Sequence, residues 1–172
     1  MTKVKIKNIN FNEIKTFNIH DAASGAYKFS LNSDCQLDTY IPCEQSKKHL
    51  FSLFPIHLIY DKNQYEIIAG WHWIISIANY ESSIPVIVHD KKLKFEEIEE
   101  VAWQYVLGVQ FQTLNHNSNL AQCVDLIDQM PPAVSKALFQ NHIKKTSQAT
   151  IQDLAGVTRN VIRNQIKNYE KQ

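Results

Sequence analysis

The sequence has little glycine, proline or cysteine and no long apolar run, and each scarcity excludes a class of protein. Four glycines and five prolines in 172 residues exclude collagen-like chains and Gly/Pro-rich low-complexity chains. The apolar runs, such as Val86–Val88, are far shorter than the ~18 residues of a membrane-spanning helix. With 44% hydrophobic and 20% charged residues, the composition instead predicts a folded protein with a sizeable core.

The number and spacing of the cysteines and histidines argue against disulfide bonds and metal sites. Cys35, Cys43 and Cys123 are odd in number and form no Cys-x-x-Cys pair, so reduced thiols are expected rather than a disulfide framework or zinc ribbon. The seven histidines include no pair four residues apart on a predicted helix with a carboxylate between them, so no metal site is predicted. The basic start Met1–Lys7 lacks the apolar core of a signal peptide, which favours a cytoplasmic protein.

The net charge of +1 conceals an asymmetry along the chain. Residues 136–172 hold seven Lys and Arg side chains against two carboxylates, a net charge of +5. Residues 1–135 carry eleven basic and fifteen acidic side chains, a net charge of −4. An acidic body with a basic end is the distribution expected when one part of a protein binds nucleic acid and another does not.

The first half of the chain predicts a small mixed α/β unit. Val4–Ile9 partly alternates apolar and polar residues, as a half-exposed strand does. Residues 17–43 show little periodicity and are predicted to be an irregular insertion, followed by a short helix over Glu44–Phe54 that Pro55 ends. The centre is clearer and predicts, in order, a hairpin of Ile56–Tyr60 with Tyr65–Ala69, a break at Gly70, a helix over Trp71–Tyr80 and a strand over Ile84–Val88.

The second half is predicted to be helical. Apolar residues recur at three- and four-residue steps in Lys94–Gln112, and its early glutamates suit the positive end of the helix dipole. Further helices are predicted over Ala121–Gln129, Ala133–Lys145, Gln148–Ala155 and Thr158–Lys171. The Pro131-Pro132 pair divides an N-terminal domain, residues 1–130, from a helical region, residues 131–172. The fold class expected from this order is α+β.

The most specific local pattern is a helix-turn-helix over residues 150–167. Gly156 can adopt the positive φ of the turn, Val157 can fill the angle between the helices, and Thr158 is a good N-cap. On a helical wheel, Ile162, Ile166 and Tyr169 share one side of the second helix, and basic and amide side chains share the other. The residues predicted to contact DNA are Thr158, Arg159, Asn160, Arg163 and Asn164 in the major groove, and Lys144, Lys145 and Lys167 at phosphates.

Together these runs resemble the ParB/sulfiredoxin-like superfamily over most of residues 4–167. The resemblance rests on Phe54–Tyr60, Tyr65–Gly70 and Ile84–Val88, with the helix-turn-helix following in the expected order. It implies a small mixed α/β N-terminal domain and a DNA-binding helix-turn-helix. It also implies a role in plasmid or chromosome partition, in which many members act as CTP-dependent clamps and a ParA-type ATPase is a partner.

The nucleotide motifs of that superfamily are degenerate in this chain. Where ParB proteins carry Glu-Arg-Arg after the glycine, Gly70 is followed by Trp71, His72 and Trp73, which lack the guanidinium groups that bind phosphate. The second signature of ParB proteins, Glu-Asn-x-Gln-Arg, falls on Leu107–Phe111, where its glutamate and arginine are absent and only the glutamine, Gln110, remains. The resemblance therefore implies a degenerate nucleotide pocket at Gly70, Trp71, His72, Trp73 and Gln110, without the usual binding of CTP and Mg²⁺.

The same positions exclude sulfiredoxin chemistry, because the nucleophilic cysteine of that enzyme falls on Trp71. We expect the two tryptophans to pack in the core, and His72 to be a packed rather than a catalytic histidine.

The sequence therefore predicts a site-specific, homodimeric double-stranded-DNA-binding protein of a plasmid or mobile element, associated with plasmid or nucleoid, that is not an enzyme and needs no cofactor. Two alternatives stay open. One is a module for protein interaction, with residues 17–43 as an interaction loop. The other is a divergent ParB-like nuclease or nucleotide-using enzyme, for which Glu66 and His72 are the nearby candidates.

Overall fold

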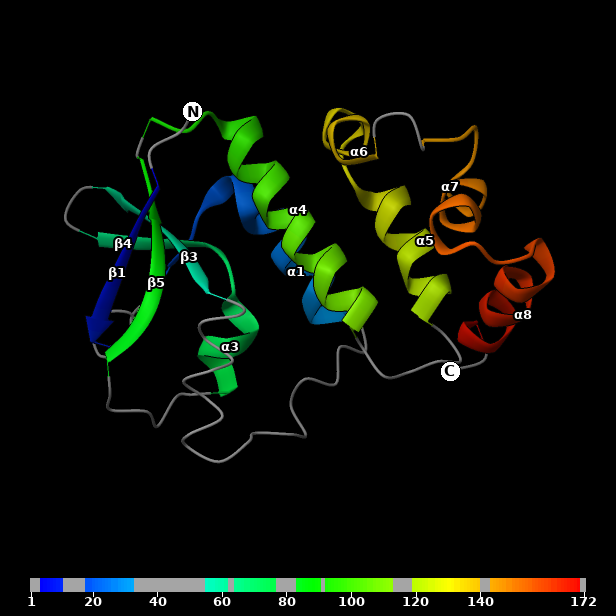
Figure 1. The fold of residues 1–172 in the computed structure, drawn as a ribbon, viewed down its shortest axis with the longest axis horizontal. Coiled ribbons are helices and arrows are strands. Elements are labelled where there is room, and N and C mark those ends of the chain that lie inside the picture. Colours follow the sequence, from blue (N-terminus) through cyan, green and yellow to red (C-terminus); the bar gives the residue numbers. More distant parts are fainter. Residues whose placement is uncertain are drawn as a thin grey trace.

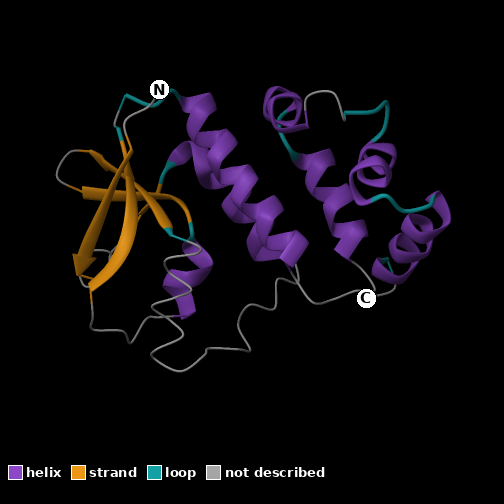
Figure 2. Cartoon of the chain, viewed as in Figure 1, coloured by secondary structure: helices purple, strands orange, loops and turns teal. Residues whose placement is uncertain are grey.

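A mixed β-sheet lies at one end of the molecule and helices form the remainder, which makes the protein α+β (Figures 1 and 2). The computed structural model describes residues 4–10, 18–32, 55–61, 64–76, 83–90, 92–112, 119–139 and 143–170. Within these ranges no helix is both long and apolar enough to cross a membrane.

Five described strands form one sheet in the order β1-β5-β3-β4-β2. The strands are β1 (Val4–Asn10), β2 (Asn18–Ile19), β3 (Ile56–Asp61), β4 (Gln64–Ala69) and β5 (Ser83–His89). β1 pairs with β5 and β3 with β4 in antiparallel fashion, whereas β3 with β5 and β2 with β4 are parallel. The predicted hairpin and the predicted strand after it are confirmed as β3, β4 and β5.

The sharp turn out of β4 depends on Gly70. Its φ of 87° lies in the left-handed region, and a Cβ at this position would lie 2.8 Å from Ile56 Cα. The chain can therefore turn closely over β3 before it enters helix α3 (Trp71–Ser76), which is the described part of the helix predicted over Trp71–Tyr80.

The prediction of an irregular insertion over residues 17–43 is wrong for residues 18–32. Here β2 pairs with β4, a 3₁₀ turn (η2, Asp21–Ala23) follows, and helix α1 (Ser24–Asn32) packs into the core. His20 Nδ1 accepts a hydrogen bond from the Ala22 N–H at 3.1 Å and so caps the turn. Alanines are three of the five buried residues of this stretch, and they leave no strong periodic signal in the sequence. Residues 33–43 and the helix predicted over Glu44–Phe54 lie outside the described residues.

Helix α4 (Phe95–Gln112) connects the two ends of the molecule. In Figure 1 it runs between the sheet and the C-terminal helices. Trp103 and Val106 of α4 belong to one continuous cluster of buried side chains that reaches from Ile56 of the sheet to Ile162 near the C-terminus. The long amphipathic helix predicted over Lys94–Gln112 is confirmed.

Within the described residues, four helices follow α4: α5 (Asn119–Gln129), α6 (Pro132–Phe139), α7 (Ser147–Ala155) and α8 (Arg159–Tyr169). The prediction of a helix over Ala133–Lys145 is wrong at its C-terminal end, because α6 ends at Phe139 and Lys144 and Lys145 are not helical. α5 packs on α4 and also on α7 and α8. The domain boundary at Pro131-Pro132 stays a prediction.

Candidate nucleic-acid interface

α7 and α8 are joined by the tight turn that the sequence predicts. Gly156 adopts φ 63° and ψ 26°, the left-handed conformation that ends α7 and redirects the chain. Val157 packs against the buried cluster, as predicted. Thr158 has the extended backbone of an N-cap, but its side chain makes no capping hydrogen bond. The N-cap position predicted for Thr158 is confirmed, and its carbonyl oxygen, rather than its hydroxyl, accepts the Val161 N–H at 3.1 Å.

α8 has two chemically distinct faces. Ile162 is 1% exposed, and Ile166 and Tyr169 are half-buried, so this side docks the helix on its neighbours. The opposite side consists of exposed side chains that donate hydrogen bonds and carry no negative charge: Arg159, Asn160, Arg163, Asn164 and Lys167. The predicted division of the helix into an apolar and a polar face is confirmed, and contact of the polar face with DNA stays a prediction.

A side-chain hydrogen bond fixes α8 against α5. Gln165 Oε1 accepts the backbone N–H of Leu120 at 2.8 Å, which satisfies an N–H in the first turn of α5 that has no partner within that helix. The sequence gave no reason to expect this contact, because Gln165 and Leu120 are 45 residues apart. α8 is thus held both by apolar burial and by a directional contact.

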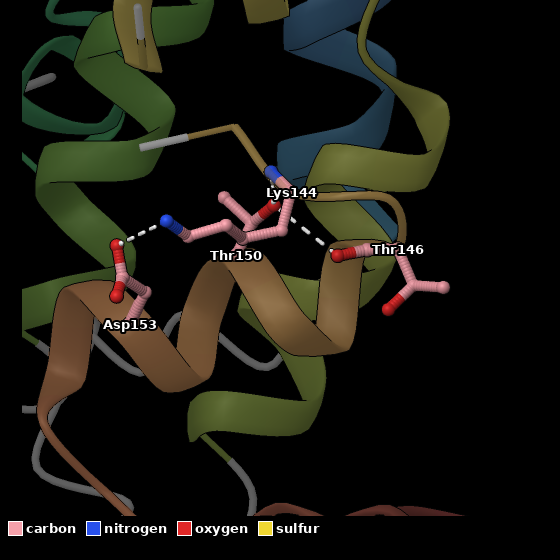
Figure 3. A network of polar contacts seen from close by, with 4 residues as sticks. All are labelled: Lys144, Thr146, Thr150 and Asp153. Atoms are coloured by element: carbon pink, nitrogen blue, oxygen red, sulfur yellow. Dashed lines mark hydrogen bonds and ion pairs between the residues drawn. The ribbon is translucent and has the colours of Figure 1, made fainter. Parts of the chain in front are cut away.

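Two of the three predicted phosphate-contacting lysines, Lys144 and Lys145, lie in the segment before α7 rather than at the end of α6. The Lys144 N–H donates to Thr150 Oγ1 at 2.9 Å, and this hydroxyl donates to the Thr146 carbonyl oxygen at 3.2 Å (Figure 3). Thr146 caps α7 by accepting the Ala149 N–H at 3.2 Å. These contacts fix the backbone of the segment before α7.

The ammonium groups of the two lysines differ in their surroundings. Lys144 Nζ reaches along α7 to Asp153 Oδ2 at 3.3 Å, and both side chains are about two-fifths exposed (Figure 3). In the described part of the chain, no ion pair is found for Lys145, Arg159 or Arg163. The positive charges of Lys145, Arg159 and Arg163 are therefore available to an external anion, whereas Asp153 partly offsets the charge of Lys144.

The residues of the degenerate nucleotide pocket include a fully buried tryptophan. Trp71 is 0% exposed, and its Nε1–H donates to Ser30 Oγ at 2.9 Å. Its ring makes edge contacts with Tyr27 and Tyr105, with centroids 5.6 and 4.9 Å away. Core packing of this tryptophan is confirmed.

The other pocket residues are described less completely. His72 Nδ1 lies 2.9 Å from the Tyr105 hydroxyl, which fits the packed histidine that the sequence predicts. The side chains of Trp73 and Gln110 lie outside the described residues. Glu66, the other residue considered for catalysis, contacts His20 with 3.7 Å between Oε2 and Nε2.

A histidine pair on the sheet was missed at the sequence level. His57 Nδ1 and His89 Nε2 lie 2.9 Å apart, and the rings stack with centroids 5.1 Å apart. The pKa of His57 is lowered from 6.5 to about 4, mainly by burial and secondly by the neighbouring His89. Burial also lowers the pKa of His89. The pair forms because β3 and β5 are adjacent and parallel, which no spacing in the sequence reveals.

We predict that this pair makes the fold sensitive to mild acid. Above about pH 6.5 His57 is neutral in both folded and unfolded chains; below it the unfolded chain binds the proton first, so stability falls as the pH approaches 4. Urea unfolding should show a loss of about 2 kcal/mol between pH 7.5 and pH 5 from His57 alone. His57→Asn should lose clearly less over this range than the parent protein, and an equal loss in both would contradict the prediction.

No protein-family model and no curated protein sequence matches this chain. Across the described ranges, no group of three or more histidine, cysteine, aspartate or glutamate side chains could hold a metal ion.

Proposed function

We propose that this chain is a ParB-like, site-specific DNA-binding protein that acts in partition or transcriptional control of a plasmid or mobile element, without a CTP switch. The observation that carries the proposal is the group of exposed Arg, Asn and Lys side chains that share one arc of α8, a helix that follows a left-handed glycine turn. A helix-turn-helix uses such a second helix to read the major groove.

The chemistry of this face suits base readout. Arginine can donate two hydrogen bonds to guanine O6 and N7, and asparagine can pair with adenine N6 and N7. Arg159, Asn160 and Arg163 occupy the first turns of α8, the part of a recognition helix that approaches the base edges. Lys167, farther along this face, and Lys145, in the segment before α7, would contact phosphates, which makes the affinity dependent on salt.

Homodimer formation is part of the proposal, because one short recognition helix reads few base pairs. Two copies on half-sites one helical turn apart would double the number of contacts and read a palindrome. A ParA-type ATPase is the partner that the resemblance implies for partition.

The absence of a CTP switch is proposed on the chemistry of the degenerate pocket. His72 and Trp73 stand at the two arginine positions of ParB proteins, and Trp71, at the glutamate position, is buried against Tyr27 and Tyr105 and donates to Ser30. An indole in an apolar core offers no charge-assisted contact to a triphosphate.

The direct test is enrichment of plasmid and host DNA fragments on the purified protein at ~150 mM salt, where weak electrostatic binding is suppressed. A short palindrome should be enriched by the parent protein and by Lys92→Ala, which removes a charge near the start of α4. It should be lost with the Arg159→Ala/Arg163→Ala variant. Equal enrichment of unrelated fragments by all three proteins would overturn the proposal.

The Lys144–Asp153 pair gives a second prediction for DNA binding. Asp153→Asn should raise the affinity two- to fivefold, because it frees the Lys144 ammonium and removes a negative charge beside the proposed phosphate contacts. The slope of log K against log salt concentration should steepen by about 1. In the Lys144→Ala background the same substitution should leave the slope unchanged, and an unchanged slope in the parent background would contradict the role of Lys144.

A protein-interaction module is the second candidate, favoured by the outer strand of the sheet. Val4 and Ile6 of β1 are 49% and 79% exposed, and large apolar side chains so exposed on an edge strand suit a protein partner. Failure to enrich any DNA, together with a stoichiometric partner whose binding is lost in Ile6→Lys, would favour this candidate.

A further inference from the structure

A cleft of about 630 Å³ opens between α5, the start of α6 and the segment that leads into α7. Its floor is apolar and includes Val124, Ile127 and Met130. This volume lies within the roughly 300–1,000 Å³ of pockets that hold small organic ligands. None of the sequence patterns pointed to it, because its walls come from four separate helices and the segment before α7.

The polar rim of the cleft is basic. Lys144, Lys145 and Arg159 line it, with Asp128 as the carboxylate in the described lining. Asp128 accepts a hydrogen bond from the Ser147 hydroxyl, and Lys144 pairs with Asp153, so both of these charges already have partners within the protein. For Lys145 and Arg159 no ion pair is found within the residues that the structure describes.

The rim is also held in place before any ligand arrives. The hydrogen bonds of Lys144 and Thr150 fix the backbone that carries Lys145. Arg159 is the first residue of α8, just after the turn at Gly156. The left-handed conformation of Gly156 therefore determines the position of the Arg159 backbone. A preorganised cationic edge beside an apolar floor binds a ligand at lower entropic cost than a mobile one.

We propose that this cleft binds a small amphipathic anion, with an aromatic or aliphatic body on the apolar floor and a carboxylate, sulfonate or phosphate between Lys145 and Arg159. The cleft is distinct from the degenerate nucleotide pocket at Gly70. The ligand is an effector, because Arg159 also belongs to the proposed DNA-reading face of α8 and cannot serve both anions at once. This last step rests on the proposed function, whereas binding in the cleft does not.

The experiment uses two fluorescent probes that share one aromatic body. 1-Anilinonaphthalene-8-sulfonate carries the anion, and N-phenyl-1-naphthylamine lacks it. The full-length protein should bind the sulfonate at one saturable site, at least tenfold more tightly than the neutral probe. Lys145→Ala/Arg159→Ala should lose at least tenfold for the sulfonate and less than twofold for the neutral probe, whereas Lys136→Ala on α6, outside the cleft lining, should match the parent.

A bulky substitution provides an independent control for the location. Gln148→Trp places an indole at the cleft wall and should weaken both probes together, with the unfolding transition unchanged. Equal affinities for the two probes, or a sulfonate affinity unchanged in the double variant, would overturn the site.

The two proposals are separated by a DNA-binding measurement at saturating sulfonate. A decrease in DNA affinity of fivefold or more is expected, and an unchanged affinity with the probe bound would overturn the effector role. If the parent protein binds no DNA while the probe pattern holds, the proposed function fails and the ligand site stands.

Discussion

Replacing Arg159 and Arg163 together by alanine is expected to lower the affinity for the specific DNA site by a factor of ~10² or more. Each arginine that reads a guanine contributes about 1–3 kcal/mol of specific binding, and the two lie on one exposed face of α8. Because neither side chain is buried, the unfolding transition should not move. Fluorescence anisotropy on the enriched palindrome, at one fixed salt concentration, measures the effect.

The matched control keeps the positive charge at position 163 but removes the planar guanidinium group. Arg163→Lys retains a cation on α8 but cannot form the two parallel hydrogen bonds of a guanidinium. It should preserve affinity for random DNA and lose most of the preference for the palindrome. If the double alanine variant retains both affinity and preference, α8 is not the recognition helix.

Replacing Trp71 by alanine is expected to lower the free energy of unfolding by about 3–5 kcal/mol, the usual cost of removing a large aromatic side chain from a core. The indole is fully buried, contacts Tyr27 and Tyr105, and donates its N–H to Ser30. Removing it leaves a cavity beside α1 and also leaves the buried Ser30 hydroxyl without that donor. Urea unfolding at neutral pH provides the measurement.

Trp71→Phe tests whether packing or ligand binding explains this residue. Phenylalanine keeps most of the buried apolar surface and loses the hydrogen bond to Ser30, so it should cost clearly less than alanine and leave DNA binding intact. A cost below 1 kcal/mol for Trp71→Ala would mean that the side chain does not pack in the core. The interpretation that the indole of Trp71 fills the degenerate nucleotide pocket would then be wrong.

The parts of the fold that sequence reasoning predicts well depend on local patterns. The hairpin of β3 and β4, the long helix α4 and the turn at Gly156 each have a short, regular signal: alternation, a three- to four-residue period, or a glycine between two amphipathic helices. The structured stretch from Asn18 to Asn32 was missed because its buried residues are mostly small and its strand has only two residues. Tertiary pairing, rather than propensity, determines such elements.

The candidate site shows the same division between local and long-range information. The exposure of Arg159, Asn160 and Arg163 follows from the helical period, and the structure agrees. The ion pair of Lys144, the end of α6 and the cleft beside Lys145 depend on how separate helices pack, which a single sequence does not encode in any spacing. The His57–His89 pair is a further case, because it needs the strand order of the sheet.

The hydrogen bond between Gln165 and the backbone of Leu120 has a consequence for how this protein can change over time. Its acceptor is a side chain of α8, but its donor is a main-chain N–H that every residue other than proline would supply at position 120. Substitutions of Leu120 by residues other than proline therefore keep this contact with α8. If α8 reads DNA as we propose, its exposed residues could be exchanged one at a time, and preference for new base sequences would be acquired while this attachment of the helix is kept.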